Sequence, residues 1–335
     1  MSPPTVSSLG ERALINRITA RLATAPWVVV GPGDDAAVVE PERGTLDVLT
    51  TDALVEGIHF DRQFVPAAAI GHRALAVNLS DLAAMGAKPR AVLLSLMLPD
   101  AFELEALDGL IDGLVTLAER YGVAVAGGNI TRSPERLIVD VTAIGSVGRR
   151  RVLRREGASP GDVVYVTGTV GDAVAGLGML RSTTSYVDAG LQTRPGNRCV
   201  ERFLRPEPRV KAGRVLAGNR LATACVDLSD GLADGVRQLA EASGIGIALD
   251  DTAIPVSAEA REWLQRQTLD VVGAAVTGGD DYELLFTARP TGGRRLKIVQ
   301  KALGELPITP IGTVTKERLL TIGGRALPEG FEHFR

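Results

Sequence analysis

The chain has 335 residues, 45% of them hydrophobic, which is enough for two domains that each bury a core. Its formal net charge is −3, and no basic helix or aromatic-rich basic patch is present, so we expect no nucleic-acid partner. It has no signal-peptide core, no apolar run long enough to cross a bilayer and only two cysteines, Cys199 and Cys225, so we expect a soluble, cytoplasmic protein with no membrane partner.

Strand and helix patterns alternate along the first part of the chain. Apolar residues at helical spacing predict helices at 11–23, 67–85 and 103–121. Short apolar runs that end at turn residues predict strands at 28–30, 36–39, 46–51, 91–98, 123–126 and 137–147. We therefore predict an N-terminal α/β domain over residues 1–148.

An arginine-rich segment follows this domain and is typical of a boundary. Its arginines are Arg149, Arg150, Arg151, Arg154 and Arg155, and Gly157, Pro160 and Gly161 come directly after them. Beyond it, the patterns predict strands at 162–167, 224–226, 245–249, 274–276 and 284–287, helices at 172–180, 209–216 and 231–242, and a polar loop at 182–197. The predicted fold class is therefore α/β (α+β), with a second α/β domain over residues 149–335.

Five short acidic motifs stand where apolar runs give way to turns. They are Gly33-Asp34-Asp35, Thr50-Thr51-Asp52, Asn78-Leu79-Ser80-Asp81, Asp227-Leu228-Ser229-Asp230-Gly231 and Gly279-Asp280-Asp281. Four of them follow the expected strands at 28–30, 46–49, 224–226 and 274–276, and ligand sites gather at strand ends. Any one motif could be only a turn, because Asp and Gly are common turn residues. Ser229 and Asp230 could cap a helix, and Ser80 with Asp81 could be a polar break.

Taken together, the motifs favour a magnesium site. Carboxylates gathered in one cleft repel each other unless a cation lies among them, and Mg²⁺ prefers hard oxygen ligands that it shares with nucleotide phosphates. The chain contains no Gly-x-x-x-x-Gly-Lys-Ser/Thr loop and neither the His-Arg-Asp nor the Asp-Phe-Gly motif of protein kinases. The sequence therefore predicts metal-assisted phosphoryl transfer by a protein outside those two kinase classes.

Ordered motifs along almost the whole chain carry a family resemblance. They include Gly31-Pro32-Gly33-Asp34-Asp35-Ala36, Gly57-Ile58-His59-Phe60, Gly127-Gly128-Asn129, Val164-Tyr165-Val166-Thr167-Gly168, 227–232, 278–284 and Gly330-Phe331-Glu332-His333-Phe334. With these motifs the chain resembles the thiamine-monophosphate kinase family of the aminoimidazole-ribonucleotide-synthetase-like superfamily. The resemblance implies transfer of the γ-phosphoryl group of ATP to thiamine monophosphate, the last step in making thiamine diphosphate, with several Mg²⁺ ions. It also implies a two-domain fold, with an N-terminal ATP- and metal-binding domain that pairs into a homodimer and a C-terminal domain that completes the site.

The family's functional positions carry over residue by residue. The resemblance implies that the magnesium ligands are Asp35, Thr50, Thr51, Asp52, Asp81, Asn129, Asp227 and Asp230. It implies that the ATP contacts are Gly128, Asn129, Arg155 and Ser229, and that the thiamine contacts are His59, Asp280 and Phe331. No side chain is expected to act as a general acid or base, because the acceptor phosphate is already ionised near neutral pH. Without the family, His59 would be interpreted as a surface or capping histidine and Phe331 as a packed tail residue.

One position departs from the family pattern. Asn129 stands where the family usually has Asp in a Gly-Gly-Asp turn. Its carbonyl oxygen can still ligate Mg²⁺, but the site loses one negative charge.

Two alternative functions stay open: a non-catalytic protein that binds a nucleotide or thiamine phosphate, and another ATP-dependent enzyme of the superfamily.

Overall fold

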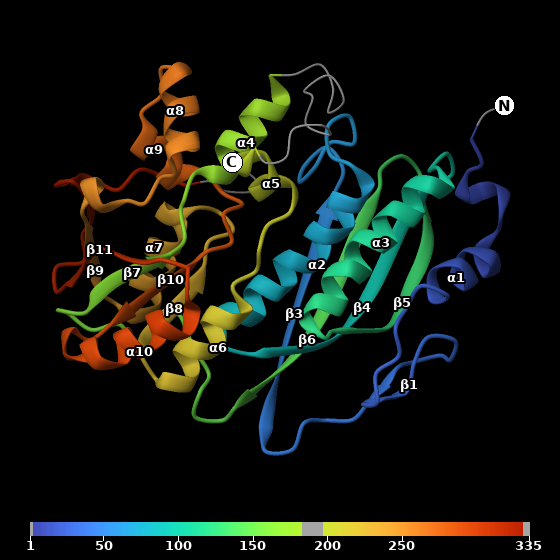
Figure 1. The fold of residues 1–335 in the computed structure, drawn as a ribbon, viewed down its shortest axis with the longest axis horizontal. Helices are drawn as coiled ribbons and strands as arrows, with labels where there is room; N and C mark the ends of the chain where they lie inside the picture. Colours follow the sequence, from blue (N-terminus) through green and yellow to red (C-terminus); the bar gives the residue numbers. More distant parts are fainter. Residues whose placement is uncertain (1–2, 183–196, 331–335) are drawn as a thin grey trace. The chain divides into compact units, whose positions relative to one another are not determined.

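The computed structural model describes residues 3–182 and 197–330, and its internal contacts divide the chain into two compact units (Figure 1). Unit 1 comprises Met1–Leu82 and Lys88–Ser146, and unit 2 comprises Ala83–Ala87 and Val147–Arg335. The expected loop at 182–197 lies outside the described residues except for its first and last residue. The expected thiamine contact Phe331 also lies outside them.

Unit 1 contains a four-stranded sheet in the order β3-β6-β4-β5. Its strands are β3 (Thr45–Val55), β4 (Lys88–Pro99), β5 (Ala124–Ser133) and β6 (Ile138–Gly148). Strand β4 runs parallel to β5 and antiparallel to β6, and the registers place Ser95 opposite both Asn129 and Asp140. Side chains that are opposite each other in a sheet point to the same face, so these three form part of one row.

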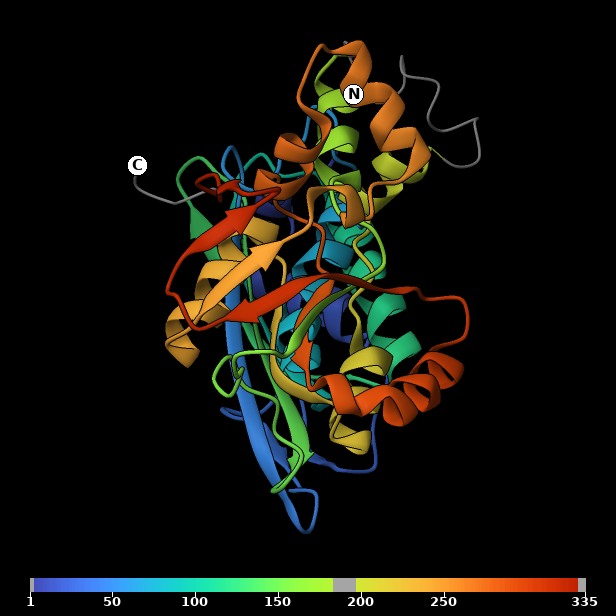
Figure 2. The same cartoon turned by 90° about the vertical axis from the view of Figure 1, so that its left-hand side faces the viewer.

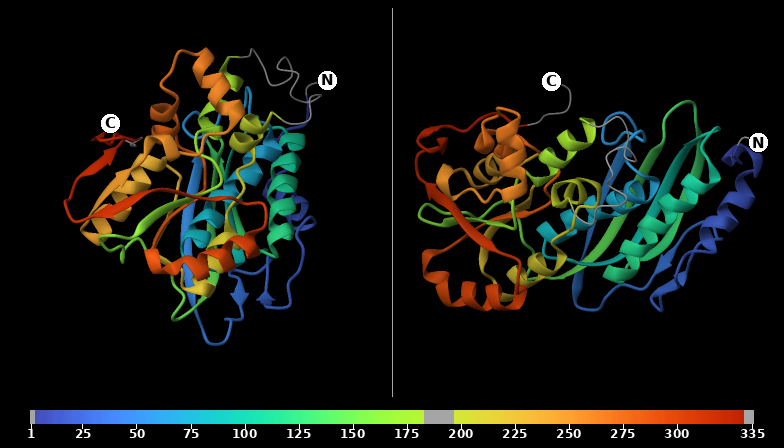
Figure 3. Two further views of the ribbon diagram at one scale, coloured as in Figure 1. Left: turned by 60° about the vertical axis from the view of Figure 1, so that its left-hand side comes forward. Right: turned by 45° about the horizontal axis from the view of Figure 1, so that its top comes forward.

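Two long helices, α2 (Ala67–Ala84) and α3 (Leu104–Tyr121), lie along one face of this sheet (Figures 1 and 3). The buried residues of α3 recur at helical spacing: Leu104, Leu107, Leu110, Ile111, Leu114, Leu117 and Ala118. Glycines bring α2 and α3 close together, because a Cβ at Gly71 would lie 1.8 Å from the Leu110 carbonyl oxygen and one at Gly113 would lie 2.0 Å from that of Ala68. We call the opposite side of the sheet the outer face.

The smaller elements of unit 1 precede the sheet. They are η1 (Val6–Ser8), α1 (Glu11–Thr19) and the antiparallel pair β1 (Val28–Val30) and β2 (Val38–Val39). The strands and helices of unit 1 lie where the sequence predicts them, but β3 and β5 continue well beyond the expected ends at 51 and 126.

Unit 2 contains a seven-stranded sheet in the order β13-β12-β9-β11-β7-β10-β8 (Figure 2). Its strands are β7 (Val163–Thr167), β8 (Ala222–Asp227), β9 (Gly246–Leu249), β10 (Leu284–Ala288), β11 (Ile308–Thr315), β12 (Leu320–Ile322) and β13 (Arg325–Ala326). Its helices are α4 (Asp172–Arg181), α5 (Arg198–Leu204), α6 (Val210–Asn219), α7 (Leu232–Ser243), α8 (Ala258–Arg266), α9 (Val271–Thr277) and α10 (Gly293–Leu303), with short turns at η2 (Asp251–Ala253) and η3 (Pro290–Gly292).

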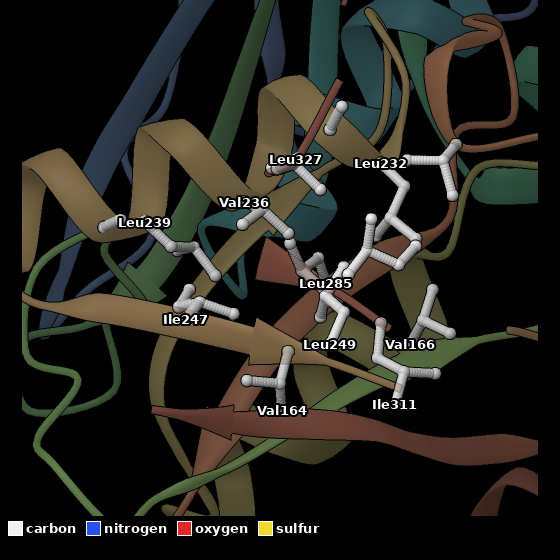
Figure 4. Close-up of a cluster of buried hydrophobic side chains, with 14 of the residues drawn as sticks. Val164, Val166, Leu232, Val236, Leu239, Ile247, Leu249, Leu285, Ile311 and Leu327 are labelled. Atoms are coloured by element: carbon white, nitrogen blue, oxygen red, sulfur yellow. The ribbon is translucent and has the colours of Figure 1, made fainter. Parts of the chain in front are cut away.

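The core of unit 2 lies between α7 and its sheet (Figure 4). Leu232, Val236 and Leu239 recur on one side of α7 at helical spacing and are fully buried. They pack with strand residues such as Ile247 and Leu285. This packing fixes the start of α7 at the end of β8, where one of the acidic motifs lies.

One predicted strand of unit 2 is wrong. Residues 274–276 belong to helix α9, in which the Ala274 N–H donates to the Asp270 carbonyl oxygen at 2.8 Å. A short apolar run fits a buried helix as well as a buried strand, and here Val271, Ala275 and Val276 provide a helical buried stripe. The motif Gly279-Asp280-Asp281 therefore follows a helix, and β10 begins only after it.

Candidate functional site

Strand β3 presents its acidic motif from its interior. The expectation that Thr50, Thr51 and Asp52 follow a strand end is wrong, because β3 continues to Val55. The Thr50 hydroxyl donates to an Asp81 carboxylate oxygen on α2. Alternate residues of a strand share a face, so Thr50 and Asp52 point to the helix side, where Asp81 lies.

Thr51 points the other way. Its hydroxyl donates to an Asp140 carboxylate oxygen at 3.1 Å and lies 3.1 Å from the Thr142 hydroxyl on the outer face. Asn129 belongs to the same face, but β6 and β4 separate it from β3. Three strand spacings amount to about 14 Å. Within one unit 1, the Thr51 and Asn129 side chains therefore lie too far apart to contact one ion together, and both are on the opposite face of the sheet from the Thr50 and Asp81 side chains.

The remaining expected residues of unit 1 lie in turns or in the sheet. Asp34 and Asp35 are exposed in the loop after β1, where the Asp35 N–H donates to Asp34 Oδ1 at 2.8 Å. His59 is half-buried in the turn after β3, and its Nδ1 accepts the Val55 N–H at 3.0 Å. A neutral His59 ring therefore carries its proton on Nε2. This contact closes the turn after β3.

Gly128 has a packing role in β5. A Cβ at this position would lie 1.9 Å from the Leu94 carbonyl oxygen of β4. Only glycine allows such an approach of two strand backbones. The expected ATP contact at Gly128 would therefore use its backbone.

In unit 2, two acidic motifs are joined by backbone hydrogen bonds. Strand β8 ends at Asp227, which is opposite Leu284 of β10. The ladder continues past both strand ends, with the Tyr282 N–H donating to the Leu228 carbonyl oxygen at 2.8 Å and the Asp280 N–H donating to that of Ser229 at 2.7 Å. The expected thiamine contact Asp280 and the expected ATP contact Ser229 are thus held in one backbone frame.

Two glycines make this approach possible. A Cβ at Gly279 would lie 2.6 Å from the Ser229 carbonyl oxygen, and a Cβ at Gly231 would lie 2.5 Å from that of Gly278. Gly231 also has a φ of 96°, in the region that favours glycine. The N-cap position of α7 is Gly231 itself, so neither Ser229 nor Asp230 occupies it.

A strained turn carries Asp280. Both Asp280 and Tyr282 have positive φ, 68° and 50°, which is uncommon for residues other than glycine. Between them, Asp281 is 1% exposed and accepts the Gly171 N–H at 2.9 Å and the Ala173 N–H at 3.4 Å. Burial raises the pKa of Asp281 well above its usual value, although these backbone bonds act in the opposite direction.

Buried charges that the sequence analysis did not select support this turn. Glu283 is 0% exposed, and its carboxylate forms ion pairs with Arg202 at 2.7 Å and with Arg209. It also accepts the Thr167 hydroxyl at 2.7 Å. The family motif over 278–284 contains Asp281 and Glu283, but only the fold distinguishes these buried carboxylates from Asp280, which is half-buried.

The segment around Arg155 borders a cavity of about 470 Å³. Its lining residues are Val152, Leu153, Arg154, Glu156, Gly157, Ala158, Ser159, Ala222, Thr223, Ala224, Ala242 and Ser243. The Ser243 hydroxyl accepts the N–H groups of Gly157 and Ala158, each at 3.2 Å, and donates to the Arg155 carbonyl oxygen at 3.3 Å. This cavity lies at the Ala222 end of β8, whereas Asp227 is at the other end, so it is separate from the acidic turn.

The donor groups suit magnesium better than a softer metal. Among residues 3–182 and 197–330, no group of three or more His, Cys, Asp and Glu side chains lies close enough to hold a metal ion. The Asp81 carboxylate with the Thr50 hydroxyl offers hard oxygen donors only. Mg²⁺ keeps several waters and is commonly bound by one or two carboxylates together with substrate phosphates, so such a donor set fits it.

The cysteines are structural. Burial raises the pKa of Cys199 to about 12 and also raises the pKa of Cys225. Both thiols are buried, so neither resembles a reactive nucleophile.

Within the described part of the chain, every helix is too short or too polar to span a membrane.

Comparisons with known proteins agree with this architecture. The family "AIR synthase related protein, N-terminal domain" matches residues 33–147, and "AIR synthase related protein, C-terminal domain" matches residues 159–324. The thiamine-monophosphate kinase of Bacillus subtilis is 33% identical over 341 residues, covering 98% of this chain and 100% of the relative.

Solved structures give the same result. The thiamine-monophosphate kinase of Stenotrophomonas maltophilia has a TM-score of 0.82 at 38% identity, covering 95% of this chain and 98% of that one. A structure described as "AaThiL complexed with AMPPCP and TMP" has a TM-score of 0.74 at 32% identity, covering 99% of both chains. The likeness therefore extends over both units.

Proposed function

The chain belongs to the thiamine-monophosphate kinase family, and we propose that it carries out this family's reaction with magnesium bound by the acidic residues of both units. It is an ATP-dependent kinase of thiamine monophosphate with the two-domain AIR-synthase-like fold. The products are thiamine diphosphate and ADP. The predictions of family, fold class and reaction are thereby confirmed.

The reaction needs positioning and charge neutralisation rather than proton transfer. The acceptor is a phosphate oxygen that is already ionised near neutral pH, so no general base is required. Bound Mg²⁺ supplies neutralisation of the charge that develops on the transferred phosphoryl group. The chain's own contribution is to hold oxygen ligands, the nucleotide and the thiamine moiety in place.

We assign the unit 1 ligands to separate groups. Thr50, Asp52 and Asp81 form the group on the helix side of the sheet, supported by the hydrogen bond from Thr50 to Asp81. Thr51 and Asn129, on the outer face, would each serve another ion. The remaining proposed ligands are Asp35 in unit 1 and Asp227 and Asp230 in unit 2.

In unit 2 the observation that carries the proposal is the 2.7 Å hydrogen bond from the Asp280 N–H to the Ser229 carbonyl oxygen. We propose that Ser229 contacts ATP and that Asp280 contacts the thiamine moiety, so that this frame keeps donor and acceptor contacts at a fixed separation. Gly128, Asn129 and Arg155 are the other proposed ATP contacts, and His59 and Phe331 are the other proposed thiamine contacts.

We also propose that the enzyme is a cytoplasmic homodimer formed through the N-terminal domain, 1–148, while the C-terminal domain, 149–335, completes the site. Exposed apolar side chains on unit 1 support pairing of this domain: Leu49 is 67% exposed in β3 and Leu93 is 39% exposed in β4. Light scattering of the purified protein tests this, with a mass near twice 35.2 kDa expected for the dimer and the monomer mass as the contrary result.

The experiment for the reaction is direct. Purified protein, ATP, Mg²⁺ and thiamine monophosphate should give thiamine diphosphate by chromatography, whereas thiamine and aminoimidazole ribonucleotide precursors should give no product. A product that requires both thiamine monophosphate and Mg²⁺ supports the proposal. ATP binding without product would favour a binding protein instead.

A further inference from the structure

The Asp280 side chain has a neighbour that fixes its direction. The Tyr282 hydroxyl donates to Asp280 Oδ1 at 3.2 Å, across one residue of the turn. Tyr282 is only 6% exposed, whereas Asp280 is half-buried. A buried donor thus holds one oxygen of a carboxylate that is more accessible to solvent than the donor itself.

The backbone of this turn is fixed on both sides. Both Asp280 and Tyr282 have positive φ, which is uncommon for residues other than glycine. Asp281 ties the turn to the start of α4 through the Gly171 and Ala173 N–H groups. The Arg202 guanidinium also donates to the Asp281 carbonyl oxygen at 2.7 Å. Strained conformations persist where the surroundings over-determine them, and they cluster at ligand-binding sites.

We propose that Tyr282 is a positioning residue, whose hydroxyl orients the Asp280 carboxylate toward a cationic, amino-bearing heterocycle such as the thiamine moiety. The inference rests on the proposed contact between Asp280 and thiamine. A hydrogen bond that holds the carboxylate in one orientation lowers the cost of ordering this side chain upon binding. Tyr282 itself need not touch the substrate.

The test is removal of the hydroxyl alone, in Tyr282→Phe. We expect the KM for thiamine monophosphate to rise about tenfold, the size typical of a hydrogen bond to a charged group, while kcat and the KM for ATP change less than about twofold. Tyr165→Phe is the matched control, because Tyr165 lies in β7 of the same unit and stacks on Phe286 at 5.3 Å. The control should leave both KM values unchanged.

A double-mutant cycle separates positioning from general packing. If Tyr282 acts through Asp280, Tyr282→Phe should add little to the KM effect of Asp280→Ala, because without the carboxylate the hydroxyl has nothing to orient. Fully additive effects, an unchanged KM for thiamine monophosphate in Tyr282→Phe, or an equal rise of both KM values would each overturn the proposal. Failure of the wild-type protein to phosphorylate thiamine monophosphate would instead contradict the proposed function, so the two failures are distinguishable.

Discussion

Two segments with the same three letters, Leu-Ser-Asp, hold their carboxylates by different means. In unit 1, residues 79–81 lie inside helix α2, where Ser80 is fully buried and Asp81 meets the Thr50 hydroxyl of a neighbouring strand. In unit 2, residues 228–230 form the turn between β8 and α7, and backbone hydrogen bonds join that turn to residues 280 and 282. The first carboxylate is therefore met by a side chain from another element, whereas the second lies on a turn that backbone hydrogen bonds hold, and its Oδ2 accepts the neighbouring Ser229 hydroxyl at 3.4 Å.

The first prediction asks whether both carboxylates serve chemistry despite this difference. Asp81→Asn and Asp230→Asn should each lower kcat by at least about 1,000-fold, because loss of a metal ligand removes several kcal/mol of transition-state stabilisation. The free energy of unfolding should change by less than about 1 kcal/mol, since each change keeps the shape of the side chain. Initial rates and urea unfolding measure the two quantities.

Asp112→Asn is the matched control: Asp112 is 61% exposed on α3 and forms a surface ion pair with Arg21 at 3.0 Å, so kcat should stay unchanged and the free energy of unfolding should change by less than about 1 kcal/mol. A large loss of stability with a proportionate loss of activity in Asp81→Asn would mean that Asp81 is a structural residue of α2. The same result in Asp230→Asn would mean that Asp230 only supports the turn.

The second prediction targets the backbone frame of unit 2. Gly279→Ala should destabilise the protein by about 2 kcal/mol, because its Cβ would lie 2.6 Å from the Ser229 carbonyl oxygen and the turn would have to move. The KM for thiamine monophosphate should rise with it. Gly218→Ala in α6 is the control, since nothing lies within 4 Å of its Cβ, and alanine there should stabilise by about 0.5 kcal/mol. A Gly279→Ala protein as stable and active as the wild type would show that the frame tolerates movement.

Sequence patterns were sufficient for most elements of unit 1. The helices α2 and α3 have long apolar periodicity, and the predicted 67–85 and 103–121 differ from them by one residue at an end. Strands β3 and β5 were predicted too short, because the predicted strand at 123–126 stops at glycines and the one at 46–51 stops before Asp52. Cross-strand pairing, which no local pattern contains, extends both strands.

Unit 2 was predicted less completely. The run at 274–276 was assigned to a strand, and helices α5, α8 and α10 and strands β11 to β13 were not predicted. These helices have only seven to eleven residues, so an apolar stripe repeats over few turns; α8, for example, buries only Ala260 and Leu264. The sequence therefore located the acidic turn and the strands β8 and β10 that flank it, but not helix α5, whose Arg202 supports it.

The expected site residues came from family motifs, and their arrangement came only from the fold. A motif such as Thr50-Thr51-Asp52 gives no register, so it cannot say that Thr50 and Thr51 lie on opposite faces of β3. Likewise, Asp281 and Glu283 have the same side-chain chemistry as the acidic residues expected to bind metal. Only their burial and their hydrogen-bond and ion-pair partners show that they are structural.

The third prediction uses the two faces of β3. Thr50→Val and Thr51→Val should each lower kcat/KM by about tenfold, the first through the lost hydrogen bond to Asp81. Because the hydroxyls lie on opposite faces and share no ion, the effects should multiply in the double variant. Steady-state rates of the three proteins provide the measurement. A double variant no worse than one single variant would place both hydroxyls in one metal site and contradict our assignment of separate groups.

The smallest expected effect concerns Asn129. Asn129→Asp adds a negative charge on the outer face of the sheet, so the Mg²⁺ concentration for half-maximal activity should fall about threefold, since a carboxylate binds the ion more strongly than an amide oxygen does. Asn16→Asp adds the same charge to the exposed side of α1 and should leave the magnesium requirement unchanged. A magnesium titration of the three proteins decides the question. An unchanged requirement in Asn129→Asp would remove Asn129 from the metal ligands and leave the Thr50, Asp52 and Asp81 group as the ligand set of unit 1 best supported by contacts.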